Sequence, residues 1–156
     1  AGVVAAKTVI DAFQRIAVNQ STFISRGDDS GTHKKELSLW SAAQLDPATF
    51  VFWYKSVGAG MGASLNSASA MDGYIMSDRA SWLNFGNKGN LKLLFAGDSK
   101  LFNQYAYLPV SPDRYAHVKA RAAQALENWL VSPRAKQIIN SYKIGGEALF
   151  VFNARP

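Results

Sequence analysis

A guanidinium, two carboxylates and several hydroxyls crowd into one short run of the sequence. The run is Ser25-Arg26-Gly27-Asp28-Asp29-Ser30-Gly31-Thr32-His33. An arginine can grip an oxyanion with a bidentate fork, and hydroxyls add donors without charge. The apolar residues before the run predict a strand, and the pattern after it predicts a helix. Because the first amides of a helix lack intrahelical acceptors, this junction can bind a small tetrahedral oxyanion.

The role predicted for each residue of this run follows from its charge. The expected ligands of the anion in this run are Arg26, Ser30, Gly31 and Thr32. Asp28 is expected to hold the guanidinium of Arg26, since a carboxylate facing a dianion would repel it. Ser25 is expected to be a second supporting residue of the same site. Two plainer explanations stay open. Ser30 with Glu36 further along is an ordinary capping arrangement, and Arg26 can pair with Asp28 on the surface.

A second run, Gly58-Ala59-Gly60-Met61-Gly62, is rich in glycine and precedes a weakly predicted helix. Glycine lets backbone amides approach a ligand without interference from a Cβ atom. If Gly62 and Ala63 lie near Thr32, two helix N-termini converge on one anion. The alternative is that the glycines only form a turn.

Other chemistries find less support. His33 beside Ser30 suggests a nucleophile and a base, but no third residue orients the imidazole, so no catalytic residue is assigned and we expect no enzyme. The second histidine, His117, and the scattered carboxylates show no spacing typical of a metal site, and no cofactor is expected. The chain has no cysteine and no apolar run long enough to span a bilayer.

The charge balance favours an anionic partner. The chain carries 17 Lys and Arg against 11 Asp and Glu, a net charge of +6. These charges are scattered, and no basic tract with interleaved aromatics indicates nucleic-acid binding. A length of 156 residues with 48% apolar residues suffices for one sizeable core.

The elements that must position these residues alternate between strands and helices, which predicts an α/β fold with a mixed sheet. Expected strands are 22–25, 74–76, 91–95, 104–110 and 149–152. Expected helices are 5–18, 31–43, 47–56, 63–71, 78–83, 111–131 and 132–142. Asp46-Pro47, Ser111-Pro112 and Ser132-Pro133 are typical helix starts. Leu37 and Trp40 are expected in the core, as is Trp129.

Three stretches together resemble a known family. They are S-R-G-D-D-S-G-T-H-K-K-E, W-Y-K-S-V-G-A-G-M-G-A-S-L-N and Y-I-M-S-D-R-A-S-W-L. They resemble the tungstate-binding proteins of bacterial ABC importers, which are class II periplasmic solute-binding proteins. Phosphate-binding members share the R-x-D-x-S-G-T pattern of the first stretch. The resemblance covers nearly the whole chain, from about Ala5 to Asn153.

The resemblance implies a periplasmic-binding-protein-like fold. Residues 1–105 would form its second lobe, carrying the anion motif 25–33. Residues 106–156 would be a crossover strand and the C-terminal helices that return to an incomplete first lobe. Nothing resembles the Thr/Ser-rich anion loop of the first lobe, so we expect the chain to lack roughly the first third of the mature protein.

The implied function is capture of tungstate or molybdate in a cleft and delivery to a membrane permease. The alternatives are a phosphate-binding protein of the same class and a domain that senses anions or handles phosphoesters. The implied partners are the oxyanion and the permease subunit, with no nucleic acid, and the protein would lie peripheral to the membrane. The implied location is the periplasm, or the cell exterior on a lipid anchor. Exposed helix faces could also form a homodimer.

Overall fold

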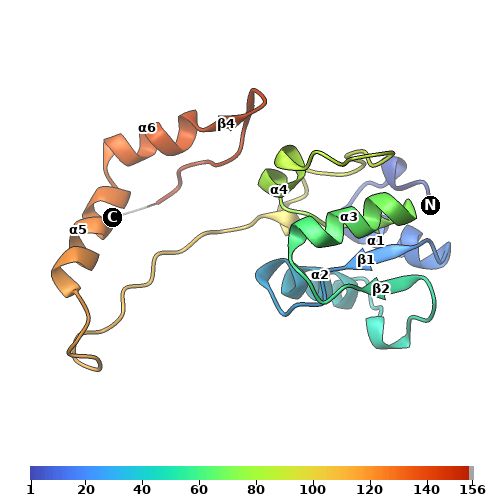
Figure 1. Cartoon of the computed structure of the whole chain (residues 1–156), viewed down its shortest axis with the longest axis horizontal. Helices are drawn as coiled ribbons and strands as arrows, with labels where there is room; N and C mark the ends of the chain where they lie inside the picture. Colours follow the sequence, from blue (N-terminus) through green and yellow to red (C-terminus); the bar gives the residue numbers. More distant parts are fainter. Residues whose placement is uncertain (155–156) are drawn as a thin grey trace. The chain divides into compact units, whose positions relative to one another are not determined.

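Residues 1–154 are described by the computed structural model, and they divide after Phe102 into two units (Figure 1). The first unit ends at Phe102, and the second begins at Asn103. Within residues 1–154, every helix is too short or too polar to cross a membrane. The two units are described in turn.

Three short parallel strands organise the first unit. They are β1 (Phe23–Ser25), β2 (Tyr54–Ser56) and β3 (Tyr74–Ile75), and β1 lies in the middle. Phe23 is in register with the first residue of each neighbour, and Ser25 is in register with Ser56. Because parallel strands all end at the same edge, the segments that follow them begin side by side there.

Helices and short 3-10 turns precede, connect and follow these strands. The helices are α1 (Val9–Val18), α2 (Gly31–Ala42), α3 (Met61–Met71) and α4 (Arg79–Asn84). The 3-10 turns are η1 (Val3–Ala5), η2 (Pro47–Thr49) and η3 (Ser99–Leu101). Figure 1 shows α3 in front of β1, with α1 and α2 behind it. Successive strand residues point to opposite faces, so the sheet is covered on both sides.

An aromatic cluster between β1, α1 and α2 forms the core of this unit. Trp40 is fully buried, and its ring centroid lies 4.4 Å from that of Phe13 and 5.2 Å from that of Phe23. Phe50 and Trp53 extend the cluster toward β2. On the opposite face of the sheet, Ile24 of β1 and Leu65 of α3 are each 1% exposed. Tilted and edge-on contacts of this kind add to the area that the rings bury.

The second unit contains two helices and a hairpin. These are α5 (Ala120–Leu130), α6 (Pro133–Ser141), β4 (Lys143–Ile144) and β5 (Glu147–Ala148). The two strands are antiparallel, and Gly145 and Gly146 between them both have positive φ. A two-residue turn with positive φ at both positions suits glycine and matches the twist of a hairpin.

The α/β fold predicted from the sequence is confirmed, with parallel and antiparallel pairing in two separate sheets. The predicted strand before the anion motif and the helix after it are both present. Trp40 is buried as predicted, but Leu37 is 38% exposed and Leu39, at 2%, takes the core position. The expectation for Leu37 was wrong because the face that α2 turns toward α1 and β1 runs through Glu36, Leu39 and Trp40.

Several predicted boundaries were wrong. The helix expected from Pro47 ends after one 3-10 turn, and residues 54–56 instead form β2 against β1. Within the described chain, residues 91–95, 104–110 and 149–152 form no strand, because no neighbouring strand pairs with them. The helix expected from Ser111 starts at Ala120, and α1 starts at Val9 rather than Ala5. Trp129, expected in the core, is 43% exposed. How residues 103–154 are assigned to a lobe stays a prediction.

Candidate oxyanion site

Two loops meet at the edge of the sheet where β1 and β2 end. The amide of Val57 donates to the carbonyl of Ser25 over 3.0 Å, and the amide of Ala59 donates to the carbonyl of Arg26 over 3.1 Å. These bonds continue the pairing of the strands by one step beyond the sheet. Since α2 follows the first loop and α3 follows the second, the bonds bring the starts of both helices to the same edge.

Gly27 permits this close meeting. Its φ is +60°, a left-handed value that disfavours side chains, and a Cβ atom built there would lie 1.8 Å from Oγ of Ser56. A side chain here would have to displace the Ser56 hydroxyl, and its Cβ atom would lie 3.1 Å from that of Ser56. Glycine is therefore favoured at the point where the loops touch.

The start of α2 is capped and still offers free donors. The Ser30 hydroxyl accepts from the amide of His33 over 3.3 Å, which is the capping bond that the sequence allowed. Among residues 1–154, the amides of Gly31 and Thr32 find no hydrogen-bond partner. These two amides point out of the positive end of the helix, where an anion is favoured. Capping and anion binding are therefore compatible here.

Arg26 is held at this edge by Asp28. Its Nη2 donates to Oδ2 of Asp28 over 2.5 Å, and the two side chains are only 17% and 19% exposed. Nε of Arg26 is buried and meets no hydrogen-bond acceptor within residues 1–154. The Ser30 side chain, followed by the Arg26 guanidinium, lowers the pKa of Asp28 to about 2. Asp28 is thus ionised at neutral pH and committed to Arg26 and Ser30.

The start of α3 is more open than that of α2. Its cap residue, Gly60, supplies no side-chain bond, and the amides of Met61, Gly62 and Ala63 have no partner in the described chain. A Cβ atom at Gly62 would meet nothing within 4 Å. Ser64 does not cap these amides, because its hydroxyl donates back to the carbonyls of Ala59 and Gly60 over 3.2 Å each. Convergence of Gly62 and Ala63 with Thr32 on one anion stays a prediction.

His33 is engaged by the backbone rather than by Ser30. Its Nδ1 accepts from the amide of Asp29 over 3.1 Å, and its contact with the Ser30 hydroxyl is made by its own backbone amide. A general base would need a ring nitrogen on the serine hydroxyl. In residues 1–154, no group of three or more His, Asp or Glu side chains could hold a metal ion.

A buried polar cluster beneath the start of α2 escaped the sequence prediction. Glu36 is 3% exposed, and its Oε1 accepts from the Tyr54 hydroxyl over 2.6 Å and from Nε1 of Trp40 over 3.2 Å. Burial raises the pKa of Glu36, and burial together with this carboxyl raises the pKa of Tyr54. The spacing of Glu36 and Trp40 could have placed both on one helix face, but residues 47–56 were expected to be helical, which hid Tyr54.

Ser25 belongs to the same cluster. It is fully buried, and its hydroxyl lies close enough to Glu36 and Tyr54 to lower the pKa of both. Its Oγ nevertheless makes no hydrogen bond of standard geometry within residues 1–154. Ser25 therefore connects the buried cluster to Arg26, the next residue along the chain.

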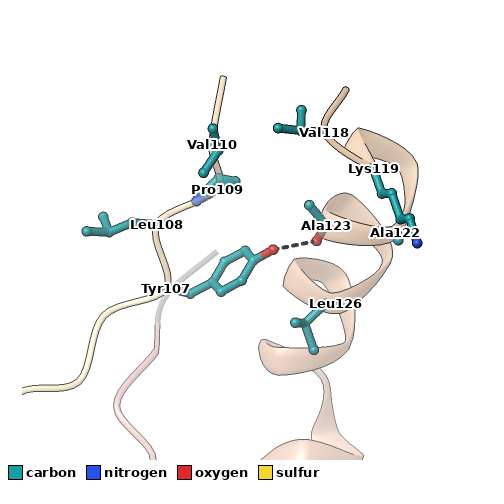
Figure 2. Close-up of a pocket in the computed structure, with 9 residues that line it drawn as sticks. All are labelled: Tyr107, Leu108, Pro109, Val110, Val118, Lys119, Ala122, Ala123 and Leu126. Atoms are coloured by element: carbon teal, nitrogen blue, oxygen red, sulfur yellow. Dashed lines mark hydrogen bonds between the residues drawn. The ribbon is translucent and has the colours of Figure 1, made fainter. Parts of the chain in front are cut away.

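The second unit has a hollow of a different kind. It measures about 510 Å³ and lies between residues 107–110 and α5 (Figure 2). Tyr107 spans it, donating to the carbonyl of Ala123 over 3.0 Å. The other residues are mainly apolar, and Figure 2 shows the ammonium of Lys119 pointing away from the gap. Such walls suit an apolar side chain rather than an oxyanion.

Comparison with protein families gives a match over most of the chain. Residues 3–134 match the model of the PBP superfamily domain. The tungstate-binding protein TupA of Peptoclostridium acidaminophilum is 39% identical over 148 residues, which are 94% of this chain and 51% of that protein. A putative ABC transporter anion-binding protein of Haloferax volcanii is 38% identical over 159 aligned residues, covering 99% of this chain and 46% of that protein.

A solved structure is also similar. The tungstate-binding protein TupA from Desulfovibrio alaskensis G20 superposes with a TM-score of 0.84 at 38% identity, covering 97% of this chain and 62% of that chain. The present chain thus spans about half the length of the curated relatives it matches.

Proposed function

This chain belongs to the PBP superfamily, and we propose that it forms part of the substrate-binding component of an ABC-type uptake system for tungstate or molybdate. One observation carries the proposal. The starts of α2 and α3, each with unpartnered amides, follow two hydrogen-bonded loops at one sheet edge, and the half-buried Arg26 lies in the first loop. The tungstate-binding relatives support this choice of ligand.

The proposed ligands are those that the sequence indicated. They are Arg26, Ser30, Gly31, Thr32, Gly62 and Ala63, with Ser25 and Asp28 in support. Taking a dianion out of water is costly, so these donors must replace its hydrogen bonds to water. Each bond to a charged group contributes about 1.5–3 kcal/mol net. Tungstate carries no proton at neutral pH and needs donors alone, which agrees with an Asp28 already committed to Arg26 and Ser30.

The domain organisation that we propose divides the chain between two lobes. Residues 1–105 would be the second lobe, and residues 106–156 would return to the first. The apolar surface of residues 103–154 includes Leu108, 82% exposed, and Leu126, 45% exposed. We expect the rest of the first lobe to cover it in the whole protein, or a second copy to do so in a homodimer.

The proposed setting follows from the same role. The protein would lie in the periplasm, or outside the cell on a lipid anchor. When loaded, it would deliver its oxyanion to the permease subunit in the membrane. Binding rather than catalysis is proposed, since Nδ1 of His33 is occupied by the Asp29 amide. A cleft that closes around the ligand would supply donors from the other lobe.

A thermal-shift series with tungstate, molybdate, sulfate and phosphate tests the proposal. A ligand at about 100 times its Kd stabilises a protein by about 2.7 kcal/mol. We expect tungstate and molybdate to raise the melting temperature of the wild-type chain, and Arg26→Ala to abolish the shift. Arg134→Ala on α6 is the matched control, because its guanidinium is exposed and, within the described part of the chain, bonds only Gln137.

Three results would contradict this function. An equal shift in Arg26→Ala would show that tungstate binds elsewhere. A shift with phosphate alone would favour the phosphate-binding alternative. Turnover of a generic phosphoester, lost in His33→Ala, would replace transport with phosphoester chemistry.

A further inference from the structure

Glu36 lies under the proposed oxyanion site without being one of its ligands. We propose that Glu36 is a positioning residue, which fixes the start of α2 against β2 through the Tyr54 hydroxyl and thereby sets the spacing of the anion's donors. The inference rests on the proposed function of that site. It adds a residue whose effect on binding is indirect.

The geometry ties three elements to one carboxyl group. Glu36 comes four residues after Thr32, so the two share one side of α2, about a turn apart. Its Oε1 accepts a hydrogen bond from the hydroxyl of Tyr54, the first residue of β2, over 2.6 Å. The buried hydroxyl of Ser25, the last residue of β1, lies close to the same group.

A displacement of Tyr54 would also displace the starts of α2 and α3. Ser56 lies two residues after Tyr54, and its side chain is the one that a Cβ atom at position 27 would meet. The next residue, Val57, bonds the carbonyl of Ser25 and leads to the start of α3. Displacing β2 by a fraction of an ångström would therefore alter the loop that carries Arg26 and the one that precedes Gly62.

Stability alone does not explain this buried carboxyl. Within residues 1–154, no Lys or Arg forms an ion pair with Glu36. Burying an acid without a cationic partner is costly, and an apolar side chain of similar volume usually stabilises a core as well or better. The hydrogen bonds of such a carboxyl are directional, so it can fix a geometry that an apolar side chain of the same volume cannot.

The charge of Glu36 gives the inference a second observable. The titratable groups near it are Tyr54 of β2 and His33 of its own helix, while Ser25 and Trp40 contribute neutral hydrogen bonds. Burial raises the pKa of Glu36, so it loses its proton at a higher pH than an exposed glutamate. A bound dianion disfavours that loss. Tungstate affinity should therefore fall as the pH rises through the pKa of Glu36.

The test measures tungstate affinity in the full chain by calorimetry, across the whole pH range in which the chain stays folded. We expect Glu36→Leu and Tyr54→Phe, each of which removes the hydrogen bond between the two residues, to weaken binding about tenfold, and the double variant to be no weaker than either single one. The fall in affinity with rising pH should vanish in Glu36→Gln and persist in His33→Gln. Matched controls are Glu127→Gln and Tyr105→Phe in the second unit, which should leave affinity unchanged.

The outcomes separate this inference from the function on which it rests. Folded Glu36→Leu and Tyr54→Phe variants that bind tungstate like the wild type would overturn the positioning role and leave the proposed function intact. A pH profile that disappears only in His33→Gln would also overturn it. A wild-type chain that binds no tungstate would overturn both. If Glu36→Leu does not fold, Tyr54→Phe decides, because it removes a single hydroxyl.

Discussion

Residues 1–102 bury the apolar faces of their helices, whereas residues 103–154 leave those of α5 and α6 exposed. The contrast is clear in two tryptophans. Trp40 is 0% exposed among the aromatic side chains of the first unit, and Trp129 on α5 is 43% exposed. The apolar residues of α5 recur at helical spacing more clearly than those of α2, so periodicity does not account for the contrast. The difference lies in whether the chain itself supplies the surface that such a face needs.

This difference bears on function as well as on packing. The first unit can hold its loops in fixed positions because a core lies directly beneath them. Of the described residues after Phe102, Ala135 is the one in the buried apolar set. A ligand site that needs fixed donors belongs in the first region, while the second region offers a surface for another part of the protein or another copy.

The largest expected effect compares the two tryptophans directly. Trp40→Ala should destabilise the first unit by about 3–5 kcal/mol, because it leaves a cavity in the aromatic core. Trp129→Ala, on a half-exposed helix face, should cost less than about 1 kcal/mol. Urea unfolding followed by tyrosine fluorescence and circular dichroism would measure both. Equal losses would mean that α5 has a buried partner surface in solution, and the contrast would fail.

A pair of glycines gives the next largest difference. Gly27 and Gly145 have almost the same φ, +60° and +58°, but a Cβ atom would clash with Ser56 at the first and meet nothing within 4 Å at the second. Gly27→Ala should therefore cost about 2–4 kcal/mol from strain and overpacking together, and Gly145→Ala about 1 kcal/mol from strain alone. Chemical denaturation would compare them. A harmless Gly27→Ala would show that the two loops do not meet tightly.

Acid should destabilise the first region through Asp28. Its folded-state pKa of about 2 lies below the ordinary value of 3.8, so its contribution to stability is complete above that ordinary value. The contribution is lost as the pH falls through the folded pKa. Asp28→Asn should flatten the stability profile between these two values, whereas Asp29→Asn, whose side chain is 85% exposed, should leave it in place. Melting temperatures across this pH window provide the measurement.

The smallest effect is expected on the exposed face of the second region. Leu108→Ser should change the free energy of unfolding by no more than about 0.5 kcal/mol, since Leu108 is 82% exposed. Leu65→Ala in the first region is the contrast, with an expected loss of about 2–5 kcal/mol at 1% exposure. Light scattering on the same samples would show whether Leu108→Ser also reduces self-association. A large stability loss in Leu108→Ser would reveal a covered surface.

Local interactions account for most of what could be predicted from the sequence. Ser30, Asp46, Asp78 and Ser132 each accept a backbone amide two or three residues ahead, at the helix starts expected of them. The helix expected after the glycine-rich run is present as α3, which begins at Met61, two residues earlier than expected, so that Met61 and Gly62 of the run lie in its first turn. The anion motif falls between a strand and a helix as predicted. Its role in binding remains to be measured.

Long-range contacts account for the errors. Residues 54–56 form a strand because β1 lies alongside them, which no pattern within residues 47–56 indicates. Residues 91–95 and 104–110 have apolar runs typical of strands but find no pairing partner among residues 1–154. The choice of Leu39 over Leu37 depends on which side of α2 meets α1 and β1. Each of these outcomes is decided by a surface distant in sequence.

The sequence by itself determined the chemistry of the candidate site: a guanidinium, its carboxylate partner and a capped helix start lie within eight residues, so their proximity follows from chain connectivity. Only the tertiary structure brought the start of α3 to the same sheet edge and placed Tyr54 on Glu36. The physical reason is distance along the chain. A capping bond closes a loop of a few residues at little entropic cost, whereas the pairing of β1 with β2 joins residues about thirty apart and forms only when the core is packed.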